Sequence, residues 1–330
     1  MGTMNYSVRR MREGDLRGVA ELEAGVFTDW GRLHRRDPGP LTERTDEELG
    51  YAASFDPDGN LVAVAEEGAM AGFIFCRTWG RVGWFGTFGV PTQFQGLGIG
   101  TALMTRCLEY LRGRADVIGL ETMPESGANV ALYVREGFRL VEPTVLMELP
   151  LVRMSERLEA SGGGEVLLWS RMDGSTRART LGRMAAITDE HLKGLDLRRE
   201  VEALHTRGLG ETVLVRGRGG RLAGFALLRI APYREGSSDG RAYIHALAVR
   251  RGAGDEEALA DLLRGIWTVG KRRGFTRVLG GVQGRYGRAI GLMFDHGFRG
   301  VRTAVTMVDE RSRREVFAES DAINFGRWAG

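Results

Sequence analysis

The sequence has few cysteines, few lysines and no long apolar run, and each shortage excludes a class of protein. Cys76 and Cys107 are the only cysteines in 330 residues. Two cysteines exclude a disulfide framework, and neither sits in a metal-binding pattern. No apolar run approaches the roughly 20 residues of a membrane span, and the N-terminus lacks the apolar core of a signal peptide. We therefore expect a cytoplasmic protein with no metal and no membrane partner.

Lysine is almost absent, because all basic residues except Lys193 and Lys271 are arginines. This bias indicates a GC-rich bacterial genome rather than selection for phosphate binding. The net charge of +3 hides an asymmetry: residues 1–150 carry 15 arginines and 21 acidic residues, and the rest carry 31 basic and 22 acidic residues. Opposite charges favour attraction between the two parts, and an acidic first part suits a cationic amine, although ordinary solvated surface is the simpler explanation. No motif for nucleic-acid binding accompanies the basic part.

Length and composition predict a globular chain with two domains. A chain of 330 residues can bury two ordinary cores. Its 43% hydrophobic and 27% charged residues are typical of soluble globular proteins.

A strand, a glycine-rich turn and a helix follow one another around residue 95. Residues Trp84 to Val90 have the pattern of a buried strand. Apolar residues then recur at helical spacing, at Leu103, Met104, Cys107, Leu108 and Leu111. Glycines let the backbone approach a ligand, and the unpaired N–H groups of a helix start suit a pyrophosphate.

The spacing of these glycines separates two kinds of phosphate loop. Gly96-x-Gly98-x-Gly100 lacks the G-x-G-x-x-G spacing of a dinucleotide fold, and no G-K-[ST] follows. The pattern Gln95-x-x-Gly98-x-Gly100 instead resembles the acyl-CoA pyrophosphate loop of the GNAT acetyltransferase superfamily, [Q/R]-x-x-G-x-[G/A]. On this loop alone, a simple strand–turn–helix joint remains the alternative.

A second segment, about 30 residues further on, strengthens the resemblance. It is similar to the family's N-x-x-A-x-x-L-Y-x-x-x-G-F pattern with a compressed spacing, in the residues Asn129, Ala131, Leu132, Tyr133, Gly137 and Phe138. A tyrosine on a helix is by itself as compatible with a core position. The two segments together cover residues 5–150 and imply a GNAT domain.

The remaining pattern of this part predicts a mixed α/β sheet. The expected strands are 6–11, 61–65, 71–76, 84–90, 117–122 and 144–149. The expected helices span about 14–26, 43–54, 100–111 and 129–137, with residues 27–40 irregular.

The second part of the chain repeats the first at a shift of about 160 residues. Gly297-Phe298 repeats Gly137-Phe138, residues 212–216 and 222–228 repeat the hairpin, and residues 243–249 repeat the long strand. We therefore expect two GNAT-like domains in tandem: 1–150, a linker at 151–164, and 165–330 with a C-terminal tail whose apolar residues dock on one of the domains.

The second copy has lost the residues that the resemblance assigns to catalysis. A shift of 159 places Gln95, Gly98 and Gly100 on Gly254, Glu257 and Leu259. Asn129 and Tyr133 fall on Ala289 and Met293. Asp255, Glu256 and Glu257 would repel a pyrophosphate. We expect this copy to be structural or to shape an acceptor pocket, and the alternative is a separate ligand site using His245, Arg250 and Arg251.

The resemblance implies acetyl-CoA as co-substrate and a role for each matched residue. Backbone N–H groups from Gln95 to Thr101 would bind the pyrophosphate, the backbone of Phe88 and Val90 would pair with the pantetheine arm, and an N–H near Val90 would stabilise the oxyanion. Tyr133 would protonate the thiolate. The expected co-substrate residues are Phe88, Val90, Gln95, Gly96, Leu97, Gly98, Ile99, Gly100, Thr101, Asn129 and Tyr133.

Glu121, at the end of the fifth strand, is the candidate general base, and a surface carboxylate is an equal alternative. The family often places an acid in the preceding strand, where this chain has none. Trp79 and Trp84 would line an acceptor pocket or belong to the core.

The leading hypothesis is an N-acetyltransferase that acetylates a primary amine of a small molecule by direct attack. A protein or peptide amine is a close variant and would need an open groove. A non-catalytic acyl-CoA-binding regulator is the alternative class, although binding alone does not need Tyr133. The sequence leaves the oligomeric state open.

Overall fold

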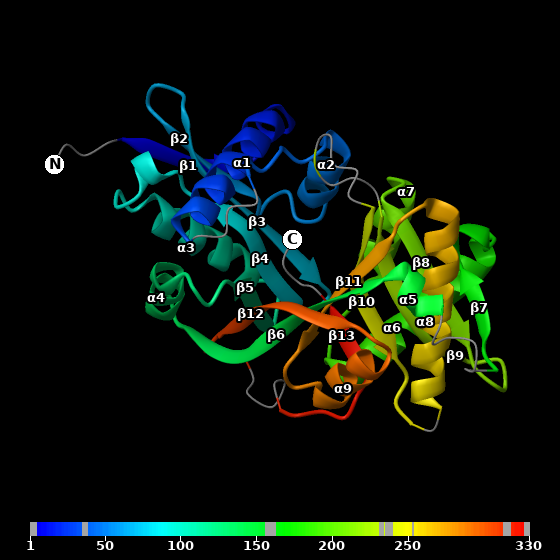
Figure 1. Ribbon diagram of the computed structural model, residues 1–330. Helices are drawn as coiled ribbons and strands as arrows, with labels where there is room; N and C mark the ends of the chain where they lie inside the picture. The colour runs from blue at the N-terminus through cyan, green and yellow to red at the C-terminus, as the bar shows by residue number, and fades with distance from the viewer. Residues whose placement is uncertain are drawn as a thin grey trace.

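The computed structural model describes residues 5–34, 39–155, 163–230, 234, 240–252, 254–312 and 318–326. These residues form two halves that lie side by side (Figure 1). Within them, thirteen strands join in one mixed sheet, in the order β1-β2-β3-β4-β5-β12-β6-β11-β10-β9-β8-β7, with β13 beside β10. The predicted mixed α/β class is confirmed.

The first half follows the predicted order of elements. Its strands are β1 (Tyr6–Arg10), β2 (Leu61–Ala65), β3 (Met70–Trp79), β4 (Val82–Gly89), β5 (Val117–Thr122) and β6 (Phe138–Pro150). Its helices are α1 (Leu16–Leu33), α2 (Asp46–Ser54), α3 (Ile99–Arg112) and α4 (Gly127–Arg135). The irregular segment predicted from residue 27 is wrong as far as Leu33, because α1 continues to that residue.

The second half repeats this order after a short helix, α5 (Leu151–Ser155). Its strands are β7 (Glu165–Leu168), β8 (Gly210–Arg216), β9 (Leu222–Arg229), β10 (Arg241–Val249), β11 (Arg277–Gln283), β12 (Arg299–Asp309) and β13 (Asn324–Gly326). Its helices are α6 (Gly174–His191), α7 (Arg198–Thr206), α8 (Asp255–Arg273) and α9 (Gly287–Asp295).

The predicted linker and tail are only partly described. The linker expected at 151–164 begins with helix α5, and its residues 156–162 lie outside the described residues. The tail prediction is confirmed for Ile323 and Phe325, which are buried against the second half. Residues 327–330 and 35–38 also lie outside the described part.

The two halves exchange their last long strands. Strand β6 does not pair with β5, although the sequence suggested that it closes the first sheet. It pairs with β11 and β12 instead, while β12 pairs with β5. Figure 1 shows β6 and β12 running next to each other between the halves. Each half therefore depends on the other to complete its sheet.

The exchange has the symmetry of a twofold axis between the halves. Thr144 pairs with Ala304, which is its own counterpart 160 residues later. On either side of this pair, Glu142 meets Thr306 and Leu146 meets Arg302. Since these pairs also interchange under the same shift, the pseudo-twofold axis passes through Thr144 and Ala304. The predicted internal repeat is confirmed and is arranged like a strand-exchanged dimer.

Reciprocal ion pairs lie between the halves. Arg77 on β3 donates to Glu200 on α7 at 3.2 Å, and Arg229 on β9 pairs with Glu48 on α2. All four side chains are buried. A shared apolar core surrounds them and draws aromatic residues of the first half, including Trp79 and Trp84, against helices of the second half. The halves form one folded body.

Candidate active site

Strands β4 and β5 separate partway along their length. Their parallel pairing runs from Val82 with Val117 only as far as Trp84 with Gly119. Beyond that point β5 pairs with β12 on its other side, and the register between β3 and β4 shifts. Phe88, a predicted pantetheine contact, lies in the separated part of β4, and Val90 follows directly. A strand that diverges from its neighbour leaves backbone groups for a ligand.

The predicted pyrophosphate loop joins the end of β4 to α3. Gly96 and Gly98 have φ values of +77° and +80°, a region that glycine adopts at no steric cost. Gly98 is the N-cap of α3, and Gln95 braces the loop by donating from Nε2 to the Val90 carbonyl at 3.0 Å. The first turn of α3 contains no acidic residue. The N–H groups at this helix start therefore favour an anion.

Tyr133 lies on α4, on the face of the sheet that α3 covers. Its side chain is 6% exposed, and its ring packs edge-on against Phe85 with centroids 5.9 Å apart. Burial raises the pKa of the Tyr133 phenol well above its usual value. The phenol thus keeps its proton and can donate it. Asn129 lies one turn earlier on the same helix.

Glu121 lies in the separated part of β5 and points to the other face of the sheet. Side chains alternate along a strand, and the neighbouring Leu120 belongs to the cluster that contains Tyr133. The Glu121 Oε1 accepts a hydrogen bond from Thr144 Oγ1 at 2.7 Å. Glu121 and Tyr133 therefore lie on opposite faces of the sheet.

Gly119 fixes the position of Trp84 beside Glu121. A Cβ on Gly119 would lie 2.1 Å from the indole ring of Trp84, so the ring rests directly on this glycine. Trp84 thereby borders the same face as Glu121 two residues further on. Trp79, the other tryptophan considered for the acceptor site, donates from Nε1 to Glu200 at 3.0 Å and belongs to the contact between the halves.

A second polar group, which the sequence did not reveal, lies on the α1 side of β4. Buried Glu23 accepts from Arg44 at 2.7 Å, and Arg44 reaches the hydroxyl of Thr87 on β4 at 3.3 Å. Arg234 from the second half lies 3.6 Å from the same carboxylate. Residues so distant in sequence give no local pattern from which this group could be predicted.

The corresponding gap in the second half is filled by the chain itself. Strand β10 pairs with β11 only as far as Ile244 with Gly280. Beyond it, β13 pairs with β10, Phe325 opposite Leu247, and the Val249 N–H donates to the Ile323 carbonyl at 2.9 Å. Gln283 on β11 donates to the Gly326 carbonyl at 2.5 Å. The tail therefore occupies the position that an extended ligand would take.

The alignment predicted for the second loop is wrong by three residues. Gly254, not Glu257, is the counterpart of Gly98, because Gly254 is the N-cap of α8 with a φ of +89°. Gln95 and Gly100 then correspond to Arg251 and Glu256. The error arose because the second loop is four residues shorter than the first.

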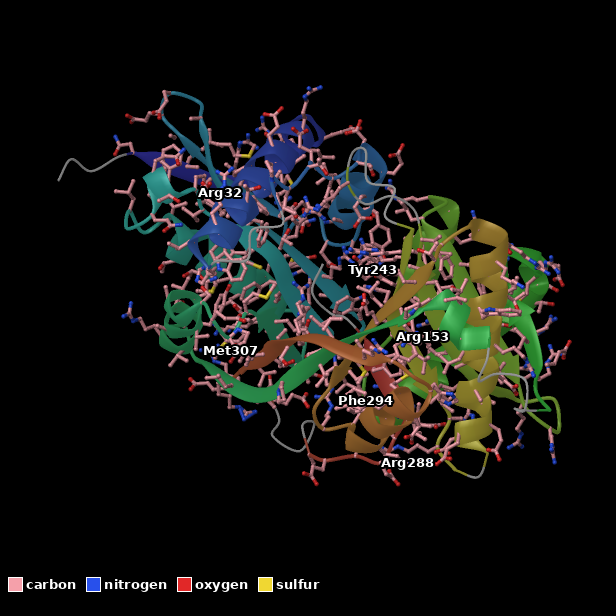
Figure 2. The ribbon with its side chains drawn as sticks, in the orientation of Figure 1. Arg32, Arg153, Tyr243, Arg288, Phe294 and Met307 are labelled. Atoms are coloured by element: carbon pink, nitrogen blue, oxygen red, sulfur yellow. The ribbon has the colours of Figure 1, made fainter. Side chains whose placement is uncertain are left out.

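The carboxylates still occupy the first turn of α8, as predicted. These residues are Asp255, Glu256 and Glu257. Arg288, on α9 (labelled in Figure 2), binds two of them: its guanidinium lies 2.7–2.8 Å from Asp255 and 2.7 Å from Glu256. Its hydrogen bonds lower the pKa of Asp255. The start of α8 is therefore acidic and is bound by an arginine of the same chain, whereas the start of α3 in the first half carries no acidic residue.

The alternative ligand site of the second half is not assembled. His245 is buried and its Nε2 lies 2.7 Å from Glu200. Arg250 pairs with Glu190, and Arg251 donates to Ser320 at 3.0 Å. Each of the three side chains therefore belongs to a different contact. Ala289 and Met293, the predicted counterparts of Asn129 and Tyr133, lie fully buried on α9.

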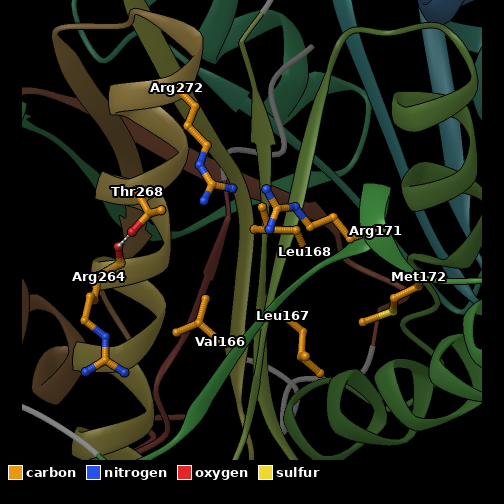
Figure 3. Close-up of a pocket in the computed structure, with 8 residues that line it drawn as sticks. All are labelled: Val166, Leu167, Leu168, Arg171, Met172, Arg264, Thr268 and Arg272. Atoms are coloured by element: carbon orange, nitrogen blue, oxygen red, sulfur yellow. Dashed lines mark hydrogen bonds between the residues drawn. The ribbon is translucent and has the colours of Figure 1, made fainter.

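A cavity of about 420 Å³ lies in the second half, between β7 and α8, and contains none of the predicted site residues (Figure 3). Its rim carries Arg171, Arg264 and Arg272, and its floor is apolar. In the described ranges, no three side chains of the metal-binding types come together, and no helix has the length and hydropathy of a membrane span.

Sequence comparisons match the first half. Residues 27–138 match the Acetyltransferase (GNAT) family. The N-alpha-acetyltransferase RimI of Mycobacterium tuberculosis is 30% identical over 42% of this chain and 82% of its own length. The mycothiol acetyltransferase of Paenarthrobacter aurescens is 34% identical over 32% of this chain. The chain spans only about a third of that relative, since the match covers 35% of it.

Solved structures match nearly the whole chain in fold. A tandem GNAT protein from the clavulanic acid biosynthesis pathway superposes with a TM-score of 0.64 at 14% identity, over 94% of this chain and 99% of that one. A GCN5-related N-acetyltransferase from Sphaerobacter thermophilus gives 0.60 at 19% identity, over 93% and 96%. Two GNAT folds in tandem are therefore established, and together with the sequence matches they show that the chain belongs to the GNAT family of acetyltransferases.

Proposed function

We propose that the chain transfers an acetyl group from acetyl-CoA to a primary amine of a small molecule, in the first half. The observation that carries the proposal is the gap between β4 and β5. Tyr133 borders it on one face of the sheet and Glu121 on the other, beside a glycine loop that has no acid in the first helical turn. This arrangement fits an acyl-CoA. The N–H groups at the helix start would bind the pyrophosphate, and the separated edge of β4 would pair with the pantetheine arm.

The chemistry needs one base and one acid. The amine nitrogen forms a bond to the thioester carbonyl carbon, and its surplus proton passes to Glu121, directly or through water. When the carbon–sulfur bond breaks, the thiolate takes a proton from the phenol of Tyr133. Burial raises the pKa of Tyr133, so the phenol holds this proton at neutral pH until the thiolate forms. Acetyl-amine and free thiol leave, and water returns the proton from Glu121 to Tyr133.

The cover over the Glu121 face favours a small acceptor. Trp84, on that face, packs in the shared core against the second half. Arg234 of the second half reaches Glu23 and donates to the Thr42 carbonyl at 2.5 Å, so the second half also closes over the α1 side. A closed site suits a small amine, and mycothiol acetyltransferase is the name of one relative. The second half would then shape the acceptor site.

A protein amine is the second candidate, because RimI, named an N-alpha-acetyltransferase, matches over most of its own length. The same gap and the same two residues would serve either acceptor, so the accessible space beside Glu121 decides between them. A non-catalytic acyl-CoA binder is less consistent with the buried phenol of Tyr133 and the half-buried carboxylate of Glu121 on the two faces of the sheet.

Thiol release from acetyl-CoA, measured with the purified full chain, tests the proposal. We expect turnover with members of a small-amine library and none with peptides bearing a free N-terminus. Turnover with peptides alone would show that the acceptor is a protein amine and not a small molecule. Absence of turnover with both, together with tight acetyl-CoA binding, would support the regulator.

A further inference from the structure

Three oxygen atoms form a hydrogen-bonded chain that ends on Glu121. Thr306 Oγ1 lies 3.1 Å from Thr144 Oγ1, which lies 2.7 Å from Glu121 Oε1. Thr144 and Thr306 are 0% and 1% exposed, so water does not compete for these contacts. The three residues come from β6, β12 and β5, which are adjacent in the sheet (Figure 1).

The direction of the chain follows from the number of protons. A hydroxyl has one proton to donate. An ionised carboxylate can only accept hydrogen bonds, so the Thr144 hydroxyl donates its hydrogen bond to Glu121. Thr144 must then accept the hydrogen bond that it shares with Thr306. The chain therefore stabilises the charged form of Glu121, which is the form that acts as a base. It also fixes one carboxyl oxygen and so orients the other.

The pseudo-twofold symmetry shows that this chain is not a by-product of the fold. The counterparts of Glu121, Thr144 and Thr306 are Gly281, Ala304 and Leu146, and the pairs Gly281–Leu146 and Glu121–Thr306 occupy equivalent positions in the sheet. The backbone is repeated, but the counterparts have no polar side-chain atom. The sheet is thus stable without these two hydroxyls and one carboxyl group, and they occur only on the side of the pseudo-twofold axis that has the open gap.

We propose that Thr144, with Thr306 behind it, is a positioning residue that holds Glu121 ionised and oriented as the general base. This inference rests on the proposed function. It also assigns a task to the second half: Thr306 belongs to that half, and Thr144 is held between strands of the second half. The active site of the first half is then completed by both halves of the chain.

One other carboxylate in this row of the sheet is already paired. Glu142 lies in the same row of the sheet, opposite Thr306. It pairs with buried Arg285 at 2.6 Å. A change at Thr144 therefore acts first on Glu121.

The experiment compares Thr144→Val with Thr144→Ser. Valine keeps the shape and removes the hydroxyl, so we expect kcat/KM at neutral pH to fall about tenfold, the loss typical of one hydrogen bond to a charged group. The acid limb of the pH profile should move about one unit upward. Serine restores the hydroxyl and should return both quantities to near wild type. Thr306→Val should give a smaller change in the same direction.

A buried strand threonine elsewhere provides the matched control. Thr212 on β8 is 2% exposed, and Thr212→Val should leave both the rate and the pH profile unchanged. If Thr144→Val retains the wild-type rate and acid limb, the inference is wrong. If Thr144→Ser is as impaired as Thr144→Val, the effect is packing and the inference is also wrong.

A readout independent of turnover separates this inference from the proposed function. The carboxyl carbon of Glu121 can be titrated by NMR in ¹³C-glutamate-labelled protein, with Glu121→Gln to assign the resonance. We expect the titration midpoint to rise in Thr144→Val and to return in Thr144→Ser. An unchanged midpoint overturns the inference, whether or not the chain turns over any amine. Absence of turnover with a shifted midpoint would refute the proposed function and leave the hydrogen-bonded chain established.

Discussion

The two halves of this chain share a backbone plan and differ where a ligand would bind. Both have a long strand that separates from its parallel neighbour and a left-handed glycine before the next helix, at Gly98 and Gly254. In the first half the helix start is uncharged. In the second half it is acidic, and β13 pairs along the separated strand. The comparison shows that one backbone plan can present different groups at the helix start and along the separated strand.

The exchange of β6 and β12 explains why the second half is kept. Each half contributes a strand to the other sheet, and the apolar core between them includes residues of both. These contacts do not involve the residues that differ between the two helix starts. On the proposed function, the second half supports the first and covers its acceptor side.

The largest expected difference in activity is between substitutions on α4 of the first half and on its counterpart α9 of the second half. Tyr133→Phe removes the proposed proton donor, so kcat should fall by about 10²–10⁴ while the Kd for acetyl-CoA stays within about twofold. The counterpart substitution Met293→Leu, in an equivalent buried position, should leave kcat unchanged. Steady-state kinetics and calorimetry check both. A Tyr133→Phe variant with wild-type kcat would remove Tyr133 from the mechanism.

The next largest effect concerns the reciprocal ion pairs. Glu200 accepts from Tyr51, Arg77, Trp79 and His245, whereas Glu48 pairs with Arg229. Glu200→Ala leaves several buried donors without a partner and should lower the free energy of unfolding by about 3–5 kcal/mol. Glu48→Ala, which removes one partner of Arg229, should have a smaller effect. Urea unfolding measures both, and equal losses would show that the two contacts are equivalent.

A moderate effect is expected in the tail. Phe325 is fully buried against the second half, so Phe325→Ala should lower the free energy of unfolding by roughly 3 kcal/mol. It should not create an acetyl-CoA site, because the three carboxylates at the start of α8 remain. Calorimetry with the variant tests the second point. A new site in Phe325→Ala would mean that the tail alone blocks binding.

The smallest expected effect is the pH dependence of stability. Burial raises the pKa of Glu200, but the neighbouring His245 and Arg77 lower it by more. The net result is a pKa of about 2, below that of an ordinary glutamate. A folded-state pKa below that of the unfolded chain stabilises the fold above about pH 4.5, and this stability is lost as pH falls towards 2. Burial lowers the pKa of His245. As pH falls, His245 therefore binds a proton in the unfolded chain before it does so in the folded chain, and stability already decreases below about pH 6.5.

Glu200→Gln separates the two contributions to this pH dependence. The variant should keep the decrease in stability near pH 6 and lose most of the decrease below pH 4.5. Urea unfolding at a series of pH values gives the curve for each protein. An identical slope below pH 4.5 in the variant and the wild type would show that Glu200 is not the group responsible.

Most helices and strands of this chain could be predicted from local sequence patterns, because each of these patterns lies within a short segment. The loop from Gln95 to Thr101, the helix with Tyr133 and the two hairpins each depend on spacing within one or two elements. The helix end at Leu33 was missed because the two prolines at positions 38 and 40 suggested an irregular segment from Phe27 onward. Between Phe27 and Leu33 the only glycine or proline is Gly31, which helix interiors tolerate.

Contacts between distant segments could not be predicted in this way. Two halves with the same strand order can close their own sheets or exchange strands, and the hydrophobic pattern of β6 suits both. For the same reason the sequence suggested Glu121 but not Thr144 or Thr306, which reach it only because of the exchange. The partners of Glu23 and Glu200 likewise come from other elements.

Calorimetric titration of acetyl-CoA into the wild type, Gly98→Glu and Gly254→Glu tests the difference between the halves most directly. The two glycines are left-handed N-caps, so both substitutions impose the same backbone strain and the same charge. We predict one site per chain, lost in Gly98→Glu and retained in Gly254→Glu. Two sites in the wild type, or loss of binding in Gly254→Glu alone, would contradict the account.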